Sequence, residues 1–289
     1  MYYLMLTVSA MLLGADFALN KIYQRIYGTA PKTVFLFNSL LGLITTGIFF
    51  AVNGFHLNFS LYSFIMAGLM SLLVMCYNMI GFRLLKSGTM AMYTLFLMTG
   101  GMVLPYIWGL LFLNEPFSVL RTAALMIILS GVVLSNFSGE RANLKQIGMC
   151  AAVFILNGCV SIISKMHQSQ TIYESVNAVE FIILGGISKF LLAGILFLVL
   201  KNKDNSESVS ISLKKAVIII ASSSMIGGVS YMLQLLGAKS LPATVLYPFI
   251  TGGSIVFAAL AGVIVFKEKL SAKLIISVIL CFAGTLMFL

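Results

Sequence analysis

The sequence predicts an all-α integral membrane protein with ten transmembrane helices, arranged as two inverted repeats of five helices. Three observations predict this fold: an apolar composition, ten long apolar runs, and one pattern that occurs twice. Of the 289 residues, 60% are hydrophobic and only 9% are charged, whereas a soluble domain carries roughly 25% charged residues. Such a chain cannot cover a water-facing surface, so we expect lipid to surround it.

Each apolar run is close to the length of about 20 residues that a helix needs to cross a bilayer. The runs are continuous, with scattered glycine, and they lack the alternation in ten-residue segments that is typical of a membrane β-barrel. We therefore predict helices throughout. In chain order they span residues 2–22, 33–53, 61–82, 88–112, 118–137, 147–165, 176–200, 216–237, 240–266 and 271–289.

The repeated pattern appears when the sequence is shifted against itself. An offset of 153 positions places residues 86–136 on residues 239–289, and an offset of 144 places the first helix on the sixth. These offsets predict two halves, residues 1–137 and 138–289. Because five helices is an odd number, the second half enters the membrane in the opposite sense. The matched pairs include Gly14 with Gly158, Lys21 with Lys165, Gly100 with Gly253, Glu115 with Glu268, and Gly131 with Gly284.

The orientation follows from the basic residues in short loops, which are enriched on the cytoplasmic side. Arg121, Lys165 and Lys239 lie on one side, and Lys189 lies within a helix. We therefore expect a multi-pass protein of the plasma membrane with both termini outside. The residues on the cytoplasmic side are Lys21, Arg25, Lys32, Arg83, Lys86, Arg141, Lys145, Lys201, Lys203, Lys214, Lys215, Lys267, Lys269 and Lys273.

Composition also limits the partners. The net charge of +10 is spread over short loops and not gathered in a soluble basic domain, so we expect no nucleic-acid partner. The four cysteines lie in apolar runs without metal-ligand spacing, so we expect neither a metal nor a cofactor. The expected partners are the lipid bilayer and a small solute, with the chain acting as a monomer or a homodimer.

Two short motifs carry a family resemblance. The first helix contains Leu13-Gly14-Ala15-Asp16-Phe17-Ala18-Leu19-Asn20-Lys21, and the sixth contains Asn157-Gly158 followed by Lys165. An acidic residue, Glu115 or Glu268, follows the fourth and the ninth helix. The chain resembles the EamA-type members of the drug/metabolite transporter superfamily. The resemblance implies a ten-helix transporter that imports or exports metabolites such as amino acids, amines or drugs.

The sequence departs from the family pattern at three places. Leu13 replaces a tryptophan, and Asp16 replaces an asparagine, which introduces an ionisable group. Asn38 stands where the second helix often carries an arginine. Many family members also keep their termini in the cytoplasm, whereas the basic loops here predict the reverse.

Ionisable residues within membrane helices are costly and therefore indicate function. Asp16 would bind an ammonium group of the solute or couple protons, unless it only pairs with Asn20 or Lys21 one turn away. Lys189, in the middle of the seventh helix, would hold an anionic group or pair with Asp16. Glu180 lies nine residues earlier, where we expect a solvated carboxylate near the outer interface.

Other polar residues within the predicted helices complete the candidate site. Hydroxyl and amide groups at this depth need partners, which a substrate cavity or helix packing can supply. Lys21 and Lys165 would act in coupling or gating together with Asp16, or anchor the helices at the interface. Glu115 and Glu268 are interpreted as structural groups that bind backbone donors at the start of the next helix. The expected substrate-binding residues are Asp16, Tyr77, Asn78, Tyr93, Asn157, Lys189, Tyr231, Gln234 and Tyr247.

These residues predict a secondary transporter that works by alternating access and is not an enzyme. No GxxxxGK[ST] nucleotide-binding loop is present, so a gradient or an exchange must supply the energy. A carboxylate and an ammonium together favour a zwitterionic or cationic metabolite, such as an amino acid or an amine. The alternative is an anionic, phosphorylated metabolite bound through Lys189. A membrane enzyme or a channel is less favoured, because His56 and His167 are assigned to loops without an acidic cluster.

Overall fold

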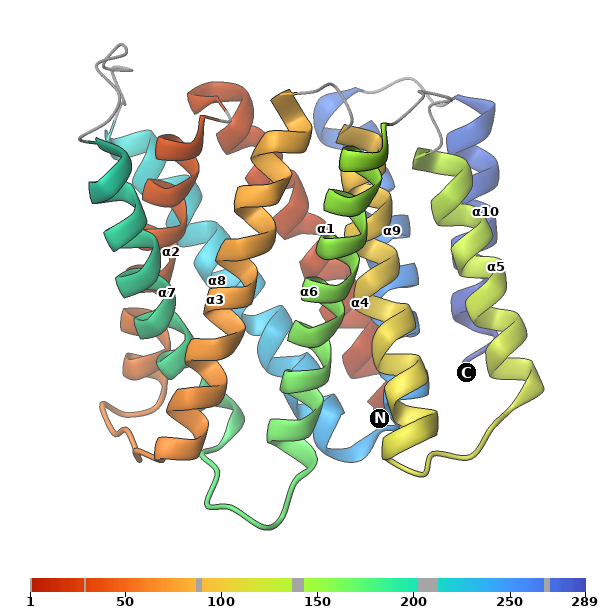
Figure 1. The fold of residues 1–289 in the computed structure, drawn as a ribbon, viewed down its shortest axis with the longest axis horizontal. Helices are drawn as coiled ribbons and strands as arrows, with labels where there is room; N and C mark the ends of the chain where they lie inside the picture. The colour runs from red at the N-terminus through yellow and green to blue at the C-terminus, as the bar shows by residue number, and fades with distance from the viewer. Residues whose placement is uncertain (1, 29, 87–89, 137–142, 202–212, 268–270) are drawn as a thin grey trace.

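The computed structural model describes residues 2–28, 30–86, 90–136, 143–201, 213–267 and 271–289. Within these ranges the chain forms ten α-helices that run alternately up and down (Figure 1). The all-helical prediction is confirmed, and each predicted run corresponds to one helix. The helices are α1 (Tyr2–Tyr27), α2 (Pro31–Val52), α3 (Leu61–Lys86), α4 (Met90–Phe112), α5 (Val119–Asn136), α6 (Leu144–Ser169), α7 (Ala178–Lys201), α8 (Leu213–Ser240), α9 (Ala243–Phe266) and α10 (Ala272–Leu286).

Eight of these helices are long and apolar enough to cross a membrane: α1 to α4 and α6 to α9. The apolar helices α5 and α10 are shorter. The 15 residues of α10 extend about 22 Å at 1.5 Å per residue, against roughly 30 Å of hydrocarbon in a typical bilayer. Large apolar side chains such as Leu4, Val119 and Ile264 are exposed on the outside of the bundle, as expected for a protein whose solvent is lipid.

Both termini lie at the same end of the bundle, which is called the terminal end below (Figure 1). The opposite end, called the basic end, is where the odd-numbered helices α1 to α9 finish and the even-numbered helices α2 to α10 begin. The described basic residues that the sequence places on the predicted cytoplasmic side lie at these helix ends. Examples are Arg25, Lys32, Lys145 and Lys273.

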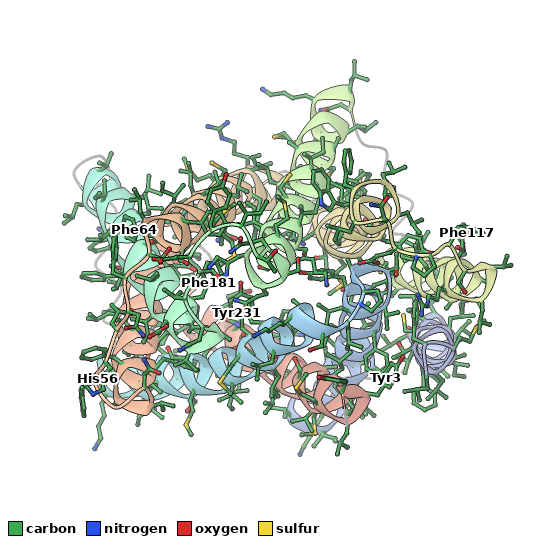
Figure 2. All side chains as sticks on the ribbon, turned by 90° about the horizontal axis from the view of Figure 1, so that it is seen from below. Tyr3, His56, Phe64, Phe117, Phe181 and Tyr231 are labelled. Atoms are coloured by element: carbon green, nitrogen blue, oxygen red, sulfur yellow. The ribbon has the colours of Figure 1, made fainter. Side chains whose placement is uncertain are left out.

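The helices pack in pairs across the bundle. The helix α2 packs against α7 at one edge, and α5 packs against α10 at the other edge. Between these edges α1 contacts α8 and α9, α6 contacts α3 and α4, and α4 contacts α9. Viewed from below, Phe181 and Tyr231 lie toward the middle of the bundle, whereas His56 and Phe117 lie at its periphery (Figure 2).

Glycines allow several of these helices to approach closely. A Cβ atom on Gly14 of α1 would lie 2.7 Å from Phe257 Cβ on α9, and one on Gly158 of α6 would lie 2.5 Å from Leu104 Cβ on α4. These distances are shorter than van der Waals contact, so larger residues would push the helices apart. The same holds for Gly42 on α2, where a Cβ would lie 2.7 Å from the carbonyl oxygen of Gly186 on α7.

Candidate functional site

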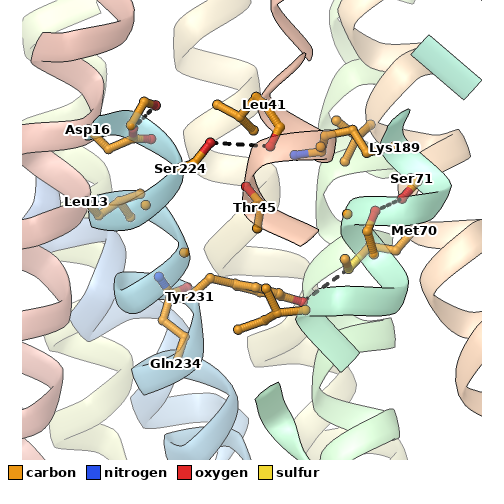
Figure 3. Close-up of a pocket in the computed structure, with 18 residues that line it drawn as sticks. Leu13, Asp16, Leu41, Thr45, Met70, Ser71, Lys189, Ser224, Tyr231 and Gln234 are labelled. Atoms are coloured by element: carbon orange, nitrogen blue, oxygen red, sulfur yellow. Dashed lines mark hydrogen bonds between the residues drawn. The ribbon is translucent and has the colours of Figure 1, made fainter. Parts of the chain in front are cut away.

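A cavity of about 290 Å³ lies between α1, α2, α3, α7 and α8, near the middle of their lengths (Figure 3). Most of its lining is apolar, with side chains such as Leu13, Val74 and Ile182. The polar lining residues come from all five helices. They are Asp16 on α1, Thr45 on α2, Ser71 on α3, and Lys189 on α7, together with Ser223, Ser224, Tyr231 and Gln234 on α8.

Asp16 is held by hydrogen bonds from two directions. The Ser223 hydroxyl on α8 donates to Oδ1, and Asn20 Nδ2, one turn further along α1, donates to Oδ2 at 3.1 Å. Gly227 leaves room for this carboxylate, since a Cβ there would lie 3.1 Å from Asp16 Cγ. The carboxylate therefore has a fixed position on one wall of the cavity.

Lys189 lines the opposite wall and extends its amino group toward the cavity (Figure 3). Among the described residues, no atom accepts a hydrogen bond from its Nζ, and no ion pair joins Lys189 to Asp16. The two charges interact only across the cavity. Because a charge away from bulk water needs compensation, the arrangement suits an occupant that brings its own opposite charges.

The lower part of the cavity, toward the terminal end, is bounded by Tyr231, Met70 and Gln234 (Figure 3). The Tyr231 hydroxyl forms hydrogen bonds with Ser164 Oγ on α6 at 2.8 Å and with Met70 Sδ on α3 at 3.2 Å. Tyr231 thus connects α8 to two other helices at the boundary of the cavity.

Four of the nine expected binding residues line this cavity: Asp16, Lys189, Tyr231 and Gln234. The lining does not include the other five. Tyr77 and Tyr93 pack in an apolar cluster with Leu84, Cys150 and Val153, and Asn78 is half-buried on α3. Asn157 donates a hydrogen bond to the Leu97 carbonyl at 2.7 Å. Tyr247 donates one to the Ser161 carbonyl at 2.5 Å.

The two expected gating lysines have different surroundings. Lys165 is buried, and its Nζ donates to the carbonyl oxygens of Ala238 and Leu241 at 2.7 and 2.6 Å. Lys21 lies at the basic end with its Nζ 4.9 Å from the centre of the Phe266 ring. The prediction for Glu268 lies outside the described residues.

Three sequence-based expectations about other residues are wrong. Glu180 is buried and not solvated. Its carboxylate accepts hydrogen bonds from Asn58 and from the Asn177 backbone at the start of α7. His167 is not in a loop but buried in α6, where Nε2 lies 2.8 Å from Ser63 Oγ. Glu115 does bind the start of a helix, but that helix is α9 and not the next one.

Sequence reasoning did not single out Ser223 and Ser224, which complete the cavity. Ser224 donates to the Leu41 carbonyl on α2 at 3.3 Å. The available signal was the run of three serines, residues 222–224, within an otherwise apolar helix. A polar run at this depth indicates either a cavity or a close helix contact.

Comparison with known proteins supports the fold only. No family model matches the sequence, and no curated protein matches it. Among the 28 matching chains of solved structures is one described only as a crystal structure of a protein. It superposes with a TM-score of 0.77 and 15% identity, over 99% of this chain and 96% of its own. Such a likeness establishes a shared architecture without indicating a function.

Proposed function

We propose that this chain is a secondary transporter of a small zwitterionic or cationic organic solute, such as an amino acid or an amine. The observation that carries the proposal is the cavity in which Asp16 and Lys189 face each other without pairing. A zwitterion places an ammonium group at Asp16 and a carboxylate at Lys189, and it thereby compensates both charges. A volume of about 290 Å³ accommodates a molecule of this size.

Alternating access requires two halves that move against each other, and the proposed halves are residues 1–137 and 138–289. The packing supports an internal two-fold relation. A Cβ on Gly131 would contact Cys281 and the Ser277 carbonyl, and a Cβ on Gly284 would contact Ile128 and the Ala124 carbonyl. Under the offset of 153, each of these contacts is the counterpart of the other.

The packing of whole helices agrees with the same relation. Exchanging α1 to α5 with α6 to α10 turns the contact of α1 with α9 into that of α6 with α4, and the contact of α1 with α8 into that of α6 with α3. The contacts of α2 with α7, α4 with α9, and α5 with α10 are unchanged by the exchange. Inverted repeats with a site between them are the usual construction of secondary transporters, which is consistent with the resemblance to the drug/metabolite transporter superfamily.

In the proposed placement all ten helices cross the plasma membrane. The shorter helices α5 and α10 cross it as a pair at one edge, where local thinning of the bilayer compensates for their length. The basic end faces the cytoplasm according to the positive-inside rule, and both termini face outside.

An anionic, phosphorylated solute is the second candidate, and Lys189 is the observation that favours it. The Asp16 carboxylate lines the same cavity and would repel such an anion, so this candidate requires that Asp16 be neutralised. A zwitterion needs no such change.

The experiment is counterflow in liposomes that contain the purified protein. Liposomes loaded with one unlabelled solute are diluted into its labelled form, with a panel of amino acids, amines and phosphorylated metabolites. We expect labelled zwitterion to accumulate transiently and saturably. Asp16→Asn and Lys189→Ala should each abolish this accumulation, whereas Glu174→Ala, at an exposed loop position, should not. Linear, non-saturating flux would indicate a channel, and chemical conversion of a solute would indicate an enzyme.

A further inference from the structure

A second group of charged and polar residues lies outside the cavity, at the terminal end. Lys165, near the end of α6, is only 6% exposed. Its ammonium donates to the carbonyl oxygens of Ala238, in the last turn of α8, and of Leu241, just after α8 ends. The carbonyls at the end of a helix carry partial negative charge, so this ammonium holds the end of α8.

Glu115, in the segment that follows α4, holds the start of α9, the helix that follows α8. Its carboxylate accepts hydrogen bonds from the backbone N–H groups of Ala243 at 2.6 Å and Thr244 at 2.9 Å, and from the Thr244 hydroxyl at 2.7 Å. The N-cap residue of α9 is Pro242, which forms no side-chain capping bond. Glu115 therefore provides the cap that the local sequence lacks. Together, Lys165 and Glu115 bind both sides of the turn between α8 and α9.

Two further contacts join the same stretch of α6 to these helices. The Tyr247 hydroxyl on α9 donates to the Ser161 carbonyl at 2.5 Å, and the Tyr231 hydroxyl on α8 lies 2.8 Å from Ser164 Oγ. Residues 161–165, about one turn of α6, therefore hold α8 and α9 at several points.

Tyr231 belongs both to these contacts and to the cavity. It lies between the Asp16–Lys189 level and the terminal end, and its ring extends from α8 toward Met70 on α3 (Figure 3). A solute that leaves the cavity toward the terminal end would pass this ring. Moving the ring aside would break the contacts of its hydroxyl with Ser164 on α6 and Met70 on α3.

We propose that Glu115, Ser161, Ser164, Lys165, Tyr231 and Tyr247 form a gate, closed in this structure, between the cavity and the terminal end. The inference rests on the proposed transport function and names the contacts that must break during alternating access. The helix α8 also links the gate to the solute site, because Ser223, which donates to Asp16, lies about 12 Å from Tyr231 along the same helix.

The test measures access to the cavity directly. The four cysteines, Cys76, Cys150, Cys159 and Cys281, are replaced by alanine, and Thr45→Cys places one thiol in the cavity lining. A membrane-impermeant thiol reagent is applied to vesicles from the side on which a C-terminal tag is accessible. We expect slow labelling in this background and labelling about tenfold faster after Lys165→Met or Glu115→Gln.

Lys239→Met is the matched control, because it removes the same charge from an exposed position in the last turn of α8 and should leave the rate unchanged. Tyr231→Phe keeps the ring but removes the hydroxyl contacts, so it provides a milder variant that should fold, with labelling about threefold faster.

The readout does not require transport, which separates the gate from the proposed function. Faster labelling in Tyr231→Phe and in either charge variant supports the gate, even if no solute in the panel exchanges. If Tyr231→Phe and every folded charge variant are labelled at the same rate as Lys239→Met, the gate is overturned, even if counterflow is intact.

Discussion

Asp16 on α1 and Lys189 on α7 face each other across one cavity, yet no ion pair joins them. Asp16 is held by Ser223 and Asn20, whereas no described residue accepts a hydrogen bond from the Lys189 ammonium. Two opposite charges with free space between them form a poor structural pair, because neither compensates the other at short range. The same geometry is well suited to a ligand that bridges them.

The first prediction concerns the carboxylate. Asp16→Asn preserves the size of the side chain but removes the charge that binds an ammonium group. A hydrogen bond to a charged group contributes about 1.5–3 kcal/mol, so the dissociation constant of the solute should rise about 10- to 100-fold. Ser223→Ala, which only releases one side of the carboxylate, should have a smaller effect. Calorimetric titration of the purified variants measures both, and equal affinities for wild type and Asp16→Asn would remove Asp16 from the site.

The second prediction separates the two ends of the solute. Lys189→Met should weaken binding of an amino acid by about 10- to 100-fold, since a charge-assisted contact to its carboxylate is lost. The decarboxylated amine of the same side chain should be unaffected or should bind more tightly, because Lys189 no longer repels it. Competition between the two ligands gives the ratio. A parallel loss for both ligands would mean that Lys189 supports the fold and does not contact a carboxylate.

Asp16 and Lys189 could be predicted as cavity residues from the sequence, because a charged side chain is rare within an apolar membrane helix. Ser223 could not be predicted in this way. A serine in a membrane helix can bond to a carbonyl of its own helix, so its presence does not indicate whether it faces a cavity. Tyr247 and Asn157 show the same ambiguity, since their polar atoms bond to the backbone of neighbouring helices, Ser161 and Leu97.

The errors at Glu115 and Glu180 have a common physical reason. Spacing along the chain correctly placed each carboxylate near a helix end, but it gives no information on which distant segment packs there. The segment after α4 lies against the start of α9, and the residues around Asn58 lie against α7. The ten helices could thus be predicted from the length of continuous apolar runs, whereas the contacts between their ends depend on tertiary packing.

A third prediction concerns a substitution that should lower the stability of the protein without changing its affinity for the solute. Glu180 is buried and bonds to Asn58 Nδ2 at 2.7 Å and to the Asn177 backbone at 3.1 Å. Glu180→Ala leaves these donors without a partner, which costs about 1–3 kcal/mol and should lower the melting temperature by several degrees. Glu174→Ala, nearby but exposed, should not. At a temperature where both variants are folded, they should bind the solute with the same affinity. A selective loss of affinity in Glu180→Ala would assign Glu180 to transport.

A fourth prediction tests the number of membrane crossings. If α5 and α10 span the bilayer together with the other eight helices, the C-terminus and the loop at residues 170–177 lie on one side and the start of α6 lies on the other. Single cysteines at Glu174 and at Lys145 in a cysteine-free background should therefore react with an impermeant reagent from opposite sides. The Glu174→Cys thiol should share the side of a C-terminal tag. Reaction of the Glu174→Cys thiol from the side opposite to the tag contradicts the ten-helix arrangement, because four crossings, α7 to α10, separate the two.

The fifth prediction uses two neighbouring glycines of α7 that have different surroundings. A Cβ on Gly186 would meet the Thr46 hydroxyl and lie 2.9 Å from the Gly42 carbonyl, whereas a Cβ on Gly185 would meet nothing within 4 Å. Both glycines line the cavity. Gly186→Ala should separate α2 from α7 and destabilise the protein by about 1–3 kcal/mol, as overpacking does.

Gly185→Ala should fold at least as well as the wild type, since alanine favours a helix by up to about 1 kcal/mol over glycine. Its methyl group would occupy cavity space between α3 and α7, where Ser71 approaches the Gly185 carbonyl. Counterflow of solutes with increasingly large side chains should therefore show a lower size limit in Gly185→Ala, with small solutes unaffected. Gly47→Ala on α2, where a Cβ also meets nothing within 4 Å and the residue does not line the cavity, is the control. If Gly185→Ala and Gly47→Ala accept the same solutes, the solute does not approach this wall of the cavity.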